Sequence, residues 1–142
     1  MPSFTTQVPN LRDVGPIVKV RLAVGSIVEE VLKRDKQSIP SAVEATAMID
    51  TGATGTVIRA EIIEQLHLKP IGTTLISTPS STDFRCYEYL MRILFPNNVV
   101  VETVVIAAPL RGQHIQCLIG RDILQNGVFI YTGYINAFTL SF

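Results

Sequence analysis

Apolar residues recur at every second position along much of this chain, and that period is typical of half-buried strands. The alternation is clearest at 16–24, where Lys19 and Arg21 stand between apolar residues. It returns at 73–77, 84–95 and 99–107 and twice within 128–142. The pattern predicts a mostly β fold with a long hairpin built from the stretches 73–77 and 84–95.

Helical spacing is confined to short stretches. One helix is predicted within 59–68, and a second, very short one at 122–126, closed by Gly127. The stretch 27–36 fits either a short amphipathic helix or a returning strand, and we favour the strand.

Two polar stretches are expected to lack regular structure. Residues 1–15 are rich in turn formers, and we expect them to form an extended N-terminal arm. The stretch 33–41 is charged and interrupted by Pro40, which predicts a solvated loop.

Length and composition indicate one domain over residues 1–142, because 47% of the residues are hydrophobic and can fill one core. The 12 basic and 12 acidic residues leave no net charge and form no basic block, so no nucleic-acid partner is expected. The chain lacks a signal-peptide pattern and a membrane-length apolar run, so we expect a cytoplasmic protein with no membrane partner. Cys86 and Cys117 lack metal-ligand spacing and are expected to be free and at least partly buried.

The main candidate for chemistry is the segment 47–53, where an apolar strand ends abruptly in Asp50, Thr51 and Gly52. Partial desolvation disfavours the charged form of a carboxyl group, so an acid at a buried strand end is suited to exchange protons. We expect the Thr51 hydroxyl to support the turn, and Gly52 to adopt backbone angles closed to other residues. Taken alone, these three residues are equally consistent with an ordinary turn.

A second apolar strand, at 117–119, also ends in glycine and polar residues: Gly120, Arg121 and Asp122. Asp-Thr-Gly-Ala followed later by an apolar-Gly-Arg-Asp run resembles the retropepsin-like aspartic proteases, over roughly residues 43–142. The resemblance implies a closed β-barrel-type acid protease fold with one or two short helices. It also implies a homodimer that acts as an aspartic endopeptidase.

The resemblance assigns roles to both motifs. Asp50 matches the catalytic aspartate and Thr51 the threonine whose hydroxyl grips the partner chain's loop, with Gly52 as support. The implied bracing of this loop comes from Gly120, Arg121 and Asp122, with Arg121 in an ion pair near the dimer seam.

Substrate contacts are also implied by the resemblance. Ala53 lies in the loop that lines the substrate cleft. Retroviral relatives often carry an acidic residue right after this alanine, where Thr54 and Gly55 stand in this chain, so substrate preference cannot be carried over. The hairpin matches the flap that covers the substrate, with Thr78, Pro79, Ser80 and Ser81 at its tip; the alternative is a plain surface hairpin. Phe84 and Tyr87, nearer its base, are further candidates for lining a pocket.

The implied mechanism uses two carboxylates, and the chain contains one Asp-Thr-Gly. The second Asp50 must come from another copy across a two-fold axis. Carboxylates this close share one proton, an effect for which the aspartic-protease dyad is itself the standard example. The dyad activates a water that attacks the peptide carbonyl, so no metal and no cofactor are required.

Three other interpretations remain open at the level of sequence. The chain could be a catalytically silent retropepsin-like module for dimerisation or peptide binding, or an unrelated β domain whose Asp-Thr-Gly is only a turn. A serine nucleophile at Ser80 or Ser81 lacks the surrounding motif, and His67 and His114 are expected to be surface or hydrogen-bonded residues.

Overall fold

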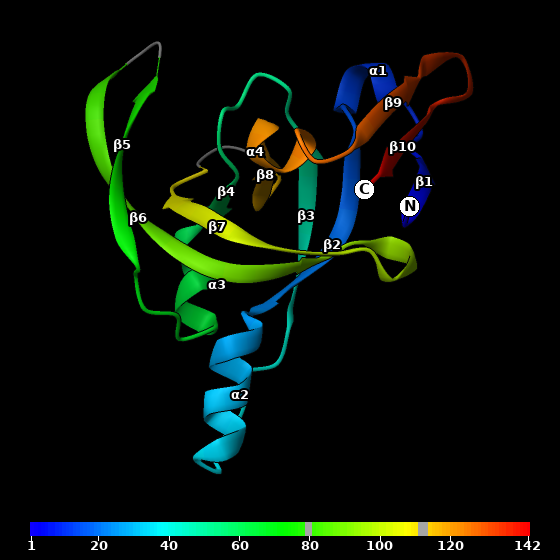
Figure 1. Ribbon diagram of the computed structural model, residues 1–142. Coiled ribbons are helices and arrows are strands. Elements are labelled where there is room, and N and C mark those ends of the chain that lie inside the picture. Colours follow the sequence, from blue (N-terminus) through cyan, green and yellow to red (C-terminus); the bar gives the residue numbers. More distant parts are fainter. Residues whose placement is uncertain (79–80, 111–113) are drawn as a thin grey trace.

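A closed barrel of six strands forms the body of the computed structural model, which describes residues 1–78, 81–110 and 114–142 (Figure 1). The barrel strands are β2 (Ile17–Val24), β3 (Val43–Ile49), β8 (Cys117–Ile119), β4 (Val57–Arg59), β7 (Val100–Ala108) and β6 (Ser81–Leu94), in spatial order. Pairing of β2 with β6 closes the ring, and β5 (Gly72–Thr78) adds to the outer edge of β6. The mostly β prediction is confirmed.

Period-two alternation explains why these segments form barrel strands. Val18, Val20 and Leu22 of β2 are buried, as are Met91 and Ile93 of β6. Because successive side chains point to opposite faces of a strand, each segment turns one apolar row into the common core. The alternating stretches are thus explained by core packing.

A second sheet of three strands joins the two ends of the chain. It places β10 (Ala137–Ser141) between β1 (Ser3–Gln7) and β9 (Val128–Thr132), so the two termini lie side by side (Figure 1). Phe138 is fully buried, and Phe4 stacks on Phe95 with ring centroids 5.5 Å apart. The apolar last strand is therefore paired on both sides by β1 and β9 of the same chain, and its burial does not require the terminus of a partner chain.

Residues 1–15 do not form the extended arm that the sequence predicted. β1 is followed by the short helix α1 (Leu11–Val14), and Leu11 is only 1% exposed. Val8 is also buried, so two apolar side chains anchor a segment whose prolines and polar residues suggested a free arm.

The prediction of a strand at 27–36 is wrong, because residues Ser26–Arg34 form helix α2. Adjacent apolar pairs fit both the period of a helix and the period of a strand, so the sequence pattern could not distinguish the two structures. The Glu102 carboxylate from β7 accepts a hydrogen bond from the Ser26 amide (2.7 Å), where the helix dipole favours an anion. A Glu29–Lys33 pair one turn apart adds a smaller stabilisation.

The remaining helices are short. α3 (Ala60–Gln65) and α4 (Arg121–Leu124) confirm the two predicted helices with slightly different ends, and single 3-10 turns occur at Pro96–Asn98 (η1) and Gly133–Ile135 (η2). In the described part of the chain no helix is long and apolar enough to cross a membrane.

Both cysteines are buried and free, as predicted. Burial raises the pKa of the Cys86 thiol and of the Cys117 thiol; for Cys117 the nearby Asp122 charge adds to the effect of burial. A thiol with a raised pKa is a poor nucleophile, so neither cysteine is a candidate for covalent chemistry.

The predicted hairpin is formed by β5 and β6, which pair Thr73 with Tyr87 and Ile76 with Phe84. Pro79 and Ser80, and the side chains of Thr78 and Ser81, lie outside the described part of the structure. Phe84 and Tyr87 are three residues apart and so project from opposite faces of β6. At most one of them can therefore face a given pocket.

The position of Phe138 predicts that the terminal sheet stabilises the single chain. Phe138→Ala should lower the free energy of unfolding by about 3–5 kcal/mol, because it removes a fully buried ring. The measurement is urea unfolding at a concentration where the chain is monomeric. Tyr134→Ala, at a 90% exposed aromatic of the same region, is the matched control and should change stability by less than about 0.5 kcal/mol. Equal effects of the two variants would contradict the intrachain packing.

Candidate active site

Parallel pairing of β3 with β8 brings the two sequence motifs together. Ile49 lies opposite Ile119, and the Asp50 amide donates to the Ile119 carbonyl at 2.9 Å. Because parallel strands end at the same edge of a sheet, Asp50 and Gly120 follow their strands at adjacent positions. The loop between β3 and β4 and helix α4 consequently lie together at the top of the molecule in Figure 1.

The Asp50 carboxylate is half-buried and held by its own turn. Its Oδ1 accepts a hydrogen bond from the Gly52 amide at 2.9 Å, and the Ala53 amide donates to the Asp50 carbonyl at 3.2 Å. Gly52 does not have a positive φ, so the expectation that it adopts backbone angles closed to other residues is wrong. A Cβ at Gly52 would lie 3.1 Å from Asp50 Oδ1, so close approach to the carboxylate favours glycine here.

Gly120 is required by the contact between the two motifs. A Cβ at this position would lie 2.5 Å from the Gly55 carbonyl oxygen and 3.1 Å from that of Ala53. Distances under about 3 Å to backbone atoms cannot be relieved by a side-chain rotation, so the loop could not lie on α4 with any other residue at 120.

Arg121 fastens the outer side of the loop by hydrogen bonds. Its Nη1 donates to the Thr51 carbonyl at 2.6 Å and its Nη2 to Thr54 Oγ1 at 3.2 Å. The expected ion pair of Arg121 is not formed among the described residues, where its partners are neutral oxygens. An arginine therefore links Thr51 and Thr54, which the sequence had assigned to different roles.

Asp122 fastens the inner side of the loop through Thr56. Its carboxylate accepts from the Thr56 hydroxyl at 2.8 Å and from the Thr56 amide at 3.0 Å. The Thr56 hydroxyl oxygen in turn accepts from the Gly120 amide at 3.0 Å, so one side chain joins both motifs. A buried polar group with complete hydrogen bonding fixes local geometry, because every broken bond leaves an unsatisfied group.

Sequence reasoning missed Thr56. It is fully buried, but in the sequence it is only a polar residue between Gly55 and the apolar pair Val57-Ile58. A polar residue between a glycine and a buried strand was the one available signal, and that signal does not reveal a partner 66 residues away.

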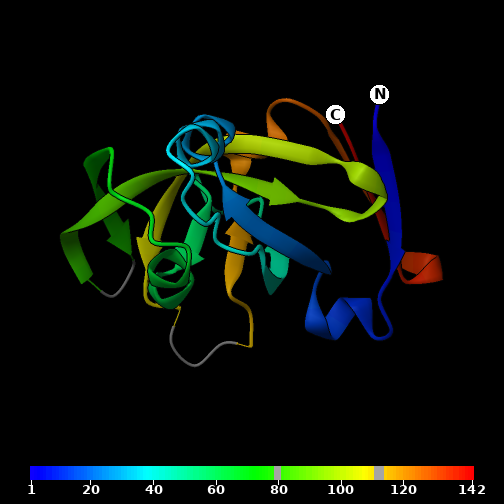
Figure 2. The same ribbon diagram turned by 90° about the horizontal axis from the view of Figure 1, so that it is seen from below.

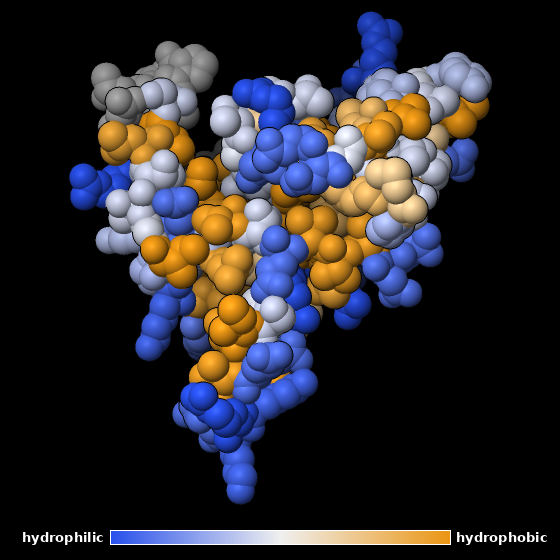
Figure 3. All heavy atoms as spheres, in the orientation of Figure 1, coloured by the Kyte–Doolittle hydropathy of each residue, from blue (hydrophilic) through white to orange (hydrophobic). Residues whose placement is uncertain are grey.

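The loop residues toward solvent differ from those that brace it. Thr51 is exposed, and its hydroxyl makes no hydrogen bond within the described ranges 1–78, 81–110 and 114–142, contrary to the expected support of the turn. Ala53 is half-buried and Thr54 exposed. Below the residues drawn in grey, the β5–β6 hairpin stands across a notch in the surface from this loop (Figure 3).

The other polar candidates do not converge on Asp50. His67 and His114 are exposed, in agreement with their predicted surface positions. Within the part of the chain that is described, no group of three or more His, Cys, Asp or Glu side chains could hold a metal ion.

A sequence model of the aspartyl protease family matches residues 38–123, more than half of the chain and both motifs. The chain belongs to this family. A comparison with curated protein sequences gives no significant match.

One solved structure supports the retropepsin-like fold of this member of the aspartyl protease family, and two further structures are similar at lower scores. A retropepsin-like aspartic protease from Rickettsia conorii is 13% identical with a TM-score of 0.51, over 99% of this chain and 93% of that one. The retroviral protease-like domain of Ddi1 from Leishmania major is 12% identical (TM-score 0.47) over 88% of both chains. The foamy viral protease-reverse transcriptase is 18% identical (TM-score 0.49), and the match covers 78% of this chain but 12% of the viral one.

The contacts of Thr56 predict that its hydroxyl holds the two motifs together. Thr56→Val keeps the shape but leaves the Gly120 amide without its acceptor, so the free energy of unfolding should fall by about 1–3 kcal/mol. Chemical denaturation is the measurement. Thr56→Ser keeps the hydroxyl, and we expect it to retain the hydrogen bonds; amide hydrogen exchange at Gly120 should accelerate in the valine variant and not in the serine variant. Slow exchange in both would contradict the assigned role.

Proposed function

We propose that this protein is a homodimeric aspartic endopeptidase whose catalytic pair is Asp50 of each chain. The observation that carries the proposal is the Asp50 carboxylate, fixed at the end of β3 by the Gly52 amide, in a loop that Thr56, Gly120 and Asp122 hold from behind. Membership of the aspartyl protease family supports the same chemistry.

The proposed reaction needs both copies of Asp50. One ionised carboxylate takes a proton from a bound water, which attacks the peptide carbonyl carbon. The protonated partner donates a hydrogen bond to the carbonyl oxygen, and the leaving nitrogen is then protonated as the C–N bond breaks. One chain provides a single carboxylate of this kind, so the monomer is expected to be inactive.

Exposed apolar residues at the terminal sheet support a dimer. Strand β9 and turn η2 expose Val128, Ile130, Tyr131, Tyr134 and Ile135, each between 48% and 90% exposed. We call this set the β9–η2 patch; β9 is also an edge strand of its sheet, so it offers free backbone groups for pairing. The unbonded Thr51 hydroxyl is proposed to contact the partner's loop at the same seam.

The substrate is proposed to bind as an extended peptide between the Asp50 loop and the β5–β6 hairpin. Backbone hydrogen bonding of a strand-like peptide suits a cleft bordered by a loop and a hairpin. Ala53 and Thr54 would line the loop side, and Thr78, Pro79, Ser80 and Ser81 the hairpin side. A hairpin that closes over the peptide would exclude water from the carboxylates.

Asp50→Asn tests the proposed chemistry. Cleavage of a peptide library by the wild type, at high protein concentration and from acidic to neutral pH, should fall by about a hundredfold to ten-thousandfold in the variant. The amide keeps the size of the side chain, and equal unfolding curves would show that the fold is intact. A stable dimer in which neither protein cleaves would favour the alternative of a catalytically silent dimerisation or peptide-binding module.

The β9–η2 patch predicts that activity depends on association. Ile130→Glu, at a 51% exposed position, should weaken the dimer by about tenfold or more, because it places a charge in an apolar interface. Sedimentation velocity measures the association, and specific activity should fall in proportion at low concentration and recover at high concentration. Val14→Glu, at a 46% exposed apolar residue outside the patch, is the control. An unchanged dimer in Ile130→Glu would reject this surface.

A further inference from the structure

Helix α2 exposes its apolar side chains instead of burying them. None of its residues is buried, and Ile27, Val28 and Val31 are 65%, 39% and 39% exposed. The helix projects from the barrel at the end opposite the Asp50 loop (Figure 1), and hydrophobic atoms gather over this part of the surface (Figure 3). An amphipathic helix in a globular protein ordinarily turns its apolar stripe toward the core.

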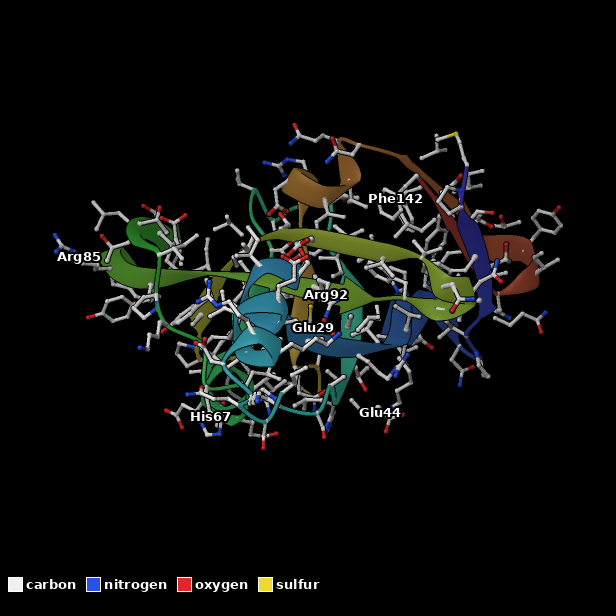
Figure 4. All side chains as sticks on the ribbon, turned by 60° about the horizontal axis from the view of Figure 1, so that its bottom comes forward. Glu29, Glu44, His67, Arg85, Arg92 and Phe142 are labelled. Atoms are coloured by element: carbon white, nitrogen blue, oxygen red, sulfur yellow. The ribbon has the colours of Figure 1, made fainter. Side chains whose placement is uncertain are left out.

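Polar contacts hold α2 in this orientation. At its first turn, the Ser26 amide and hydroxyl both donate to the Glu102 carboxylate of β7. Arg92 of β6 pairs with Glu29 and also donates to the Val24 carbonyl at 2.9 Å; Figure 4 shows the Arg92 and Glu29 side chains pointing toward one another. Hydrogen bonds from Lys33 and Arg92 lower the pKa of Glu29, so the pair remains charged at neutral pH. The polar face of α2 therefore meets the sheet, and no described segment of the chain covers the apolar stripe.

The stripe forms one wall of a groove. The opposite wall is the connection between α3 and β5, which passes beside α2 when the molecule is seen from below (Figure 2). The groove has a volume of about 590 Å³, and its apolar lining includes Ile27, Leu32, Leu68, Ile71 and Leu90. Ile71 is 60% exposed, so both walls present large apolar side chains to solvent.

The formal charge that lines the groove is positive. Lys69, on the wall formed by the α3–β5 connection, is the one charged residue among the lining residues, which include no Asp or Glu. An occupant with carboxylates beside its apolar side chains would complement this wall, whereas a basic occupant would meet like charge.

The shape of the groove distinguishes a helix from an extended peptide. The α2 wall is a helix, so this wall offers a peptide strand no sheet edge to pair with. An amphipathic helix instead needs only an apolar trough, which α2 and the α3–β5 connection provide.

We propose that this groove is a docking site for an acidic amphipathic helix of a partner protein. The site does not depend on the Asp50 chemistry, since helix α2, which lines the groove, and the Asp50 loop lie at opposite ends of the molecule (Figure 1). Binding there buries the stripe of α2 and places the acidic flank of the partner helix beside Lys69.

The test uses a designed helical peptide of about 15 residues with leucine at helical spacing and glutamate on the flanks. Matched peptides carry lysine in place of glutamate or the same residues in scrambled order. Fluorescence anisotropy with the full chain should show that the glutamate peptide binds most tightly. Methyl signals of Ile27, Val28, Leu32 and Ile71 should shift in NMR spectra on its addition.

Three variants localise the binding. Ile27→Glu should weaken binding of the glutamate peptide by roughly tenfold or more, because it places a negative charge in the apolar stripe. Lys69→Glu should invert the preference between the glutamate and lysine peptides. Val100→Glu, at a 51% exposed apolar residue of β7 that does not line the groove, should change neither affinity.

Several results would overturn the proposal. Equal affinity for the glutamate and lysine peptides would show that the occupant need not be acidic. Equal weakening of peptide binding by Ile27→Glu and Val100→Glu would show that the peptide does not bind in this groove. Self-association that Ile27→Glu abolishes would identify a second copy of this chain as the occupant. Binding of the chain to lipid vesicles, with no binding to any peptide, would identify a membrane surface. Loss of peptidase activity in Asp50→Asn bears on the proposed function and leaves these outcomes unaffected.

Discussion

The parallel pairing of β3 with β8 is the constraint on which the site depends. It sets Asp50 and Gly120 at neighbouring strand ends, and the absence of a side chain at Gly120 then allows the 53–55 backbone to lie directly on α4. The Thr56 hydroxyl and the Asp122 carboxylate complete the joint with bonds of 2.8–3.0 Å. Loosening any of these contacts would release the loop that presents the Asp50 carboxylate.

This site separates residues that position from residues that are available to react. Thr56 is buried and Gly120 is packed against backbone, so both act through the loop and not on a ligand. Thr51 and Thr54 are exposed and Asp50 is half-buried, so these three can meet another molecule. Since a catalytic geometry must be held closely to be useful, a rigid support behind a half-buried carboxylate suits the acid–base chemistry proposed for Asp50.

Helix α2 and the β9–η2 patch both present apolar side chains that no other described part of the chain covers, and their construction differs. The sheet that carries the β9–η2 patch is buried on the face of Phe138 and Leu140, and Val128 and Ile130 of the patch project from its opposite face. Helix α2 contributes no buried residue and is held by Glu102 and Arg92 instead. Neither surface is needed to complete the core, so each is free to serve an association.

The sequence by itself determined the β content, the hairpin, the two motifs and the family, because period-two alternation and a run such as Asp-Thr-Gly-Ala are local properties of the chain. It did not determine α2, because adjacent apolar pairs fit a helix and a strand equally, and the carboxylate at its first turn comes from Glu102 on a distant strand. It did not determine the cover of β10 or the role of Thr56 either. Those depend on which segments become neighbours when the barrel closes, and only the tertiary structure decides that.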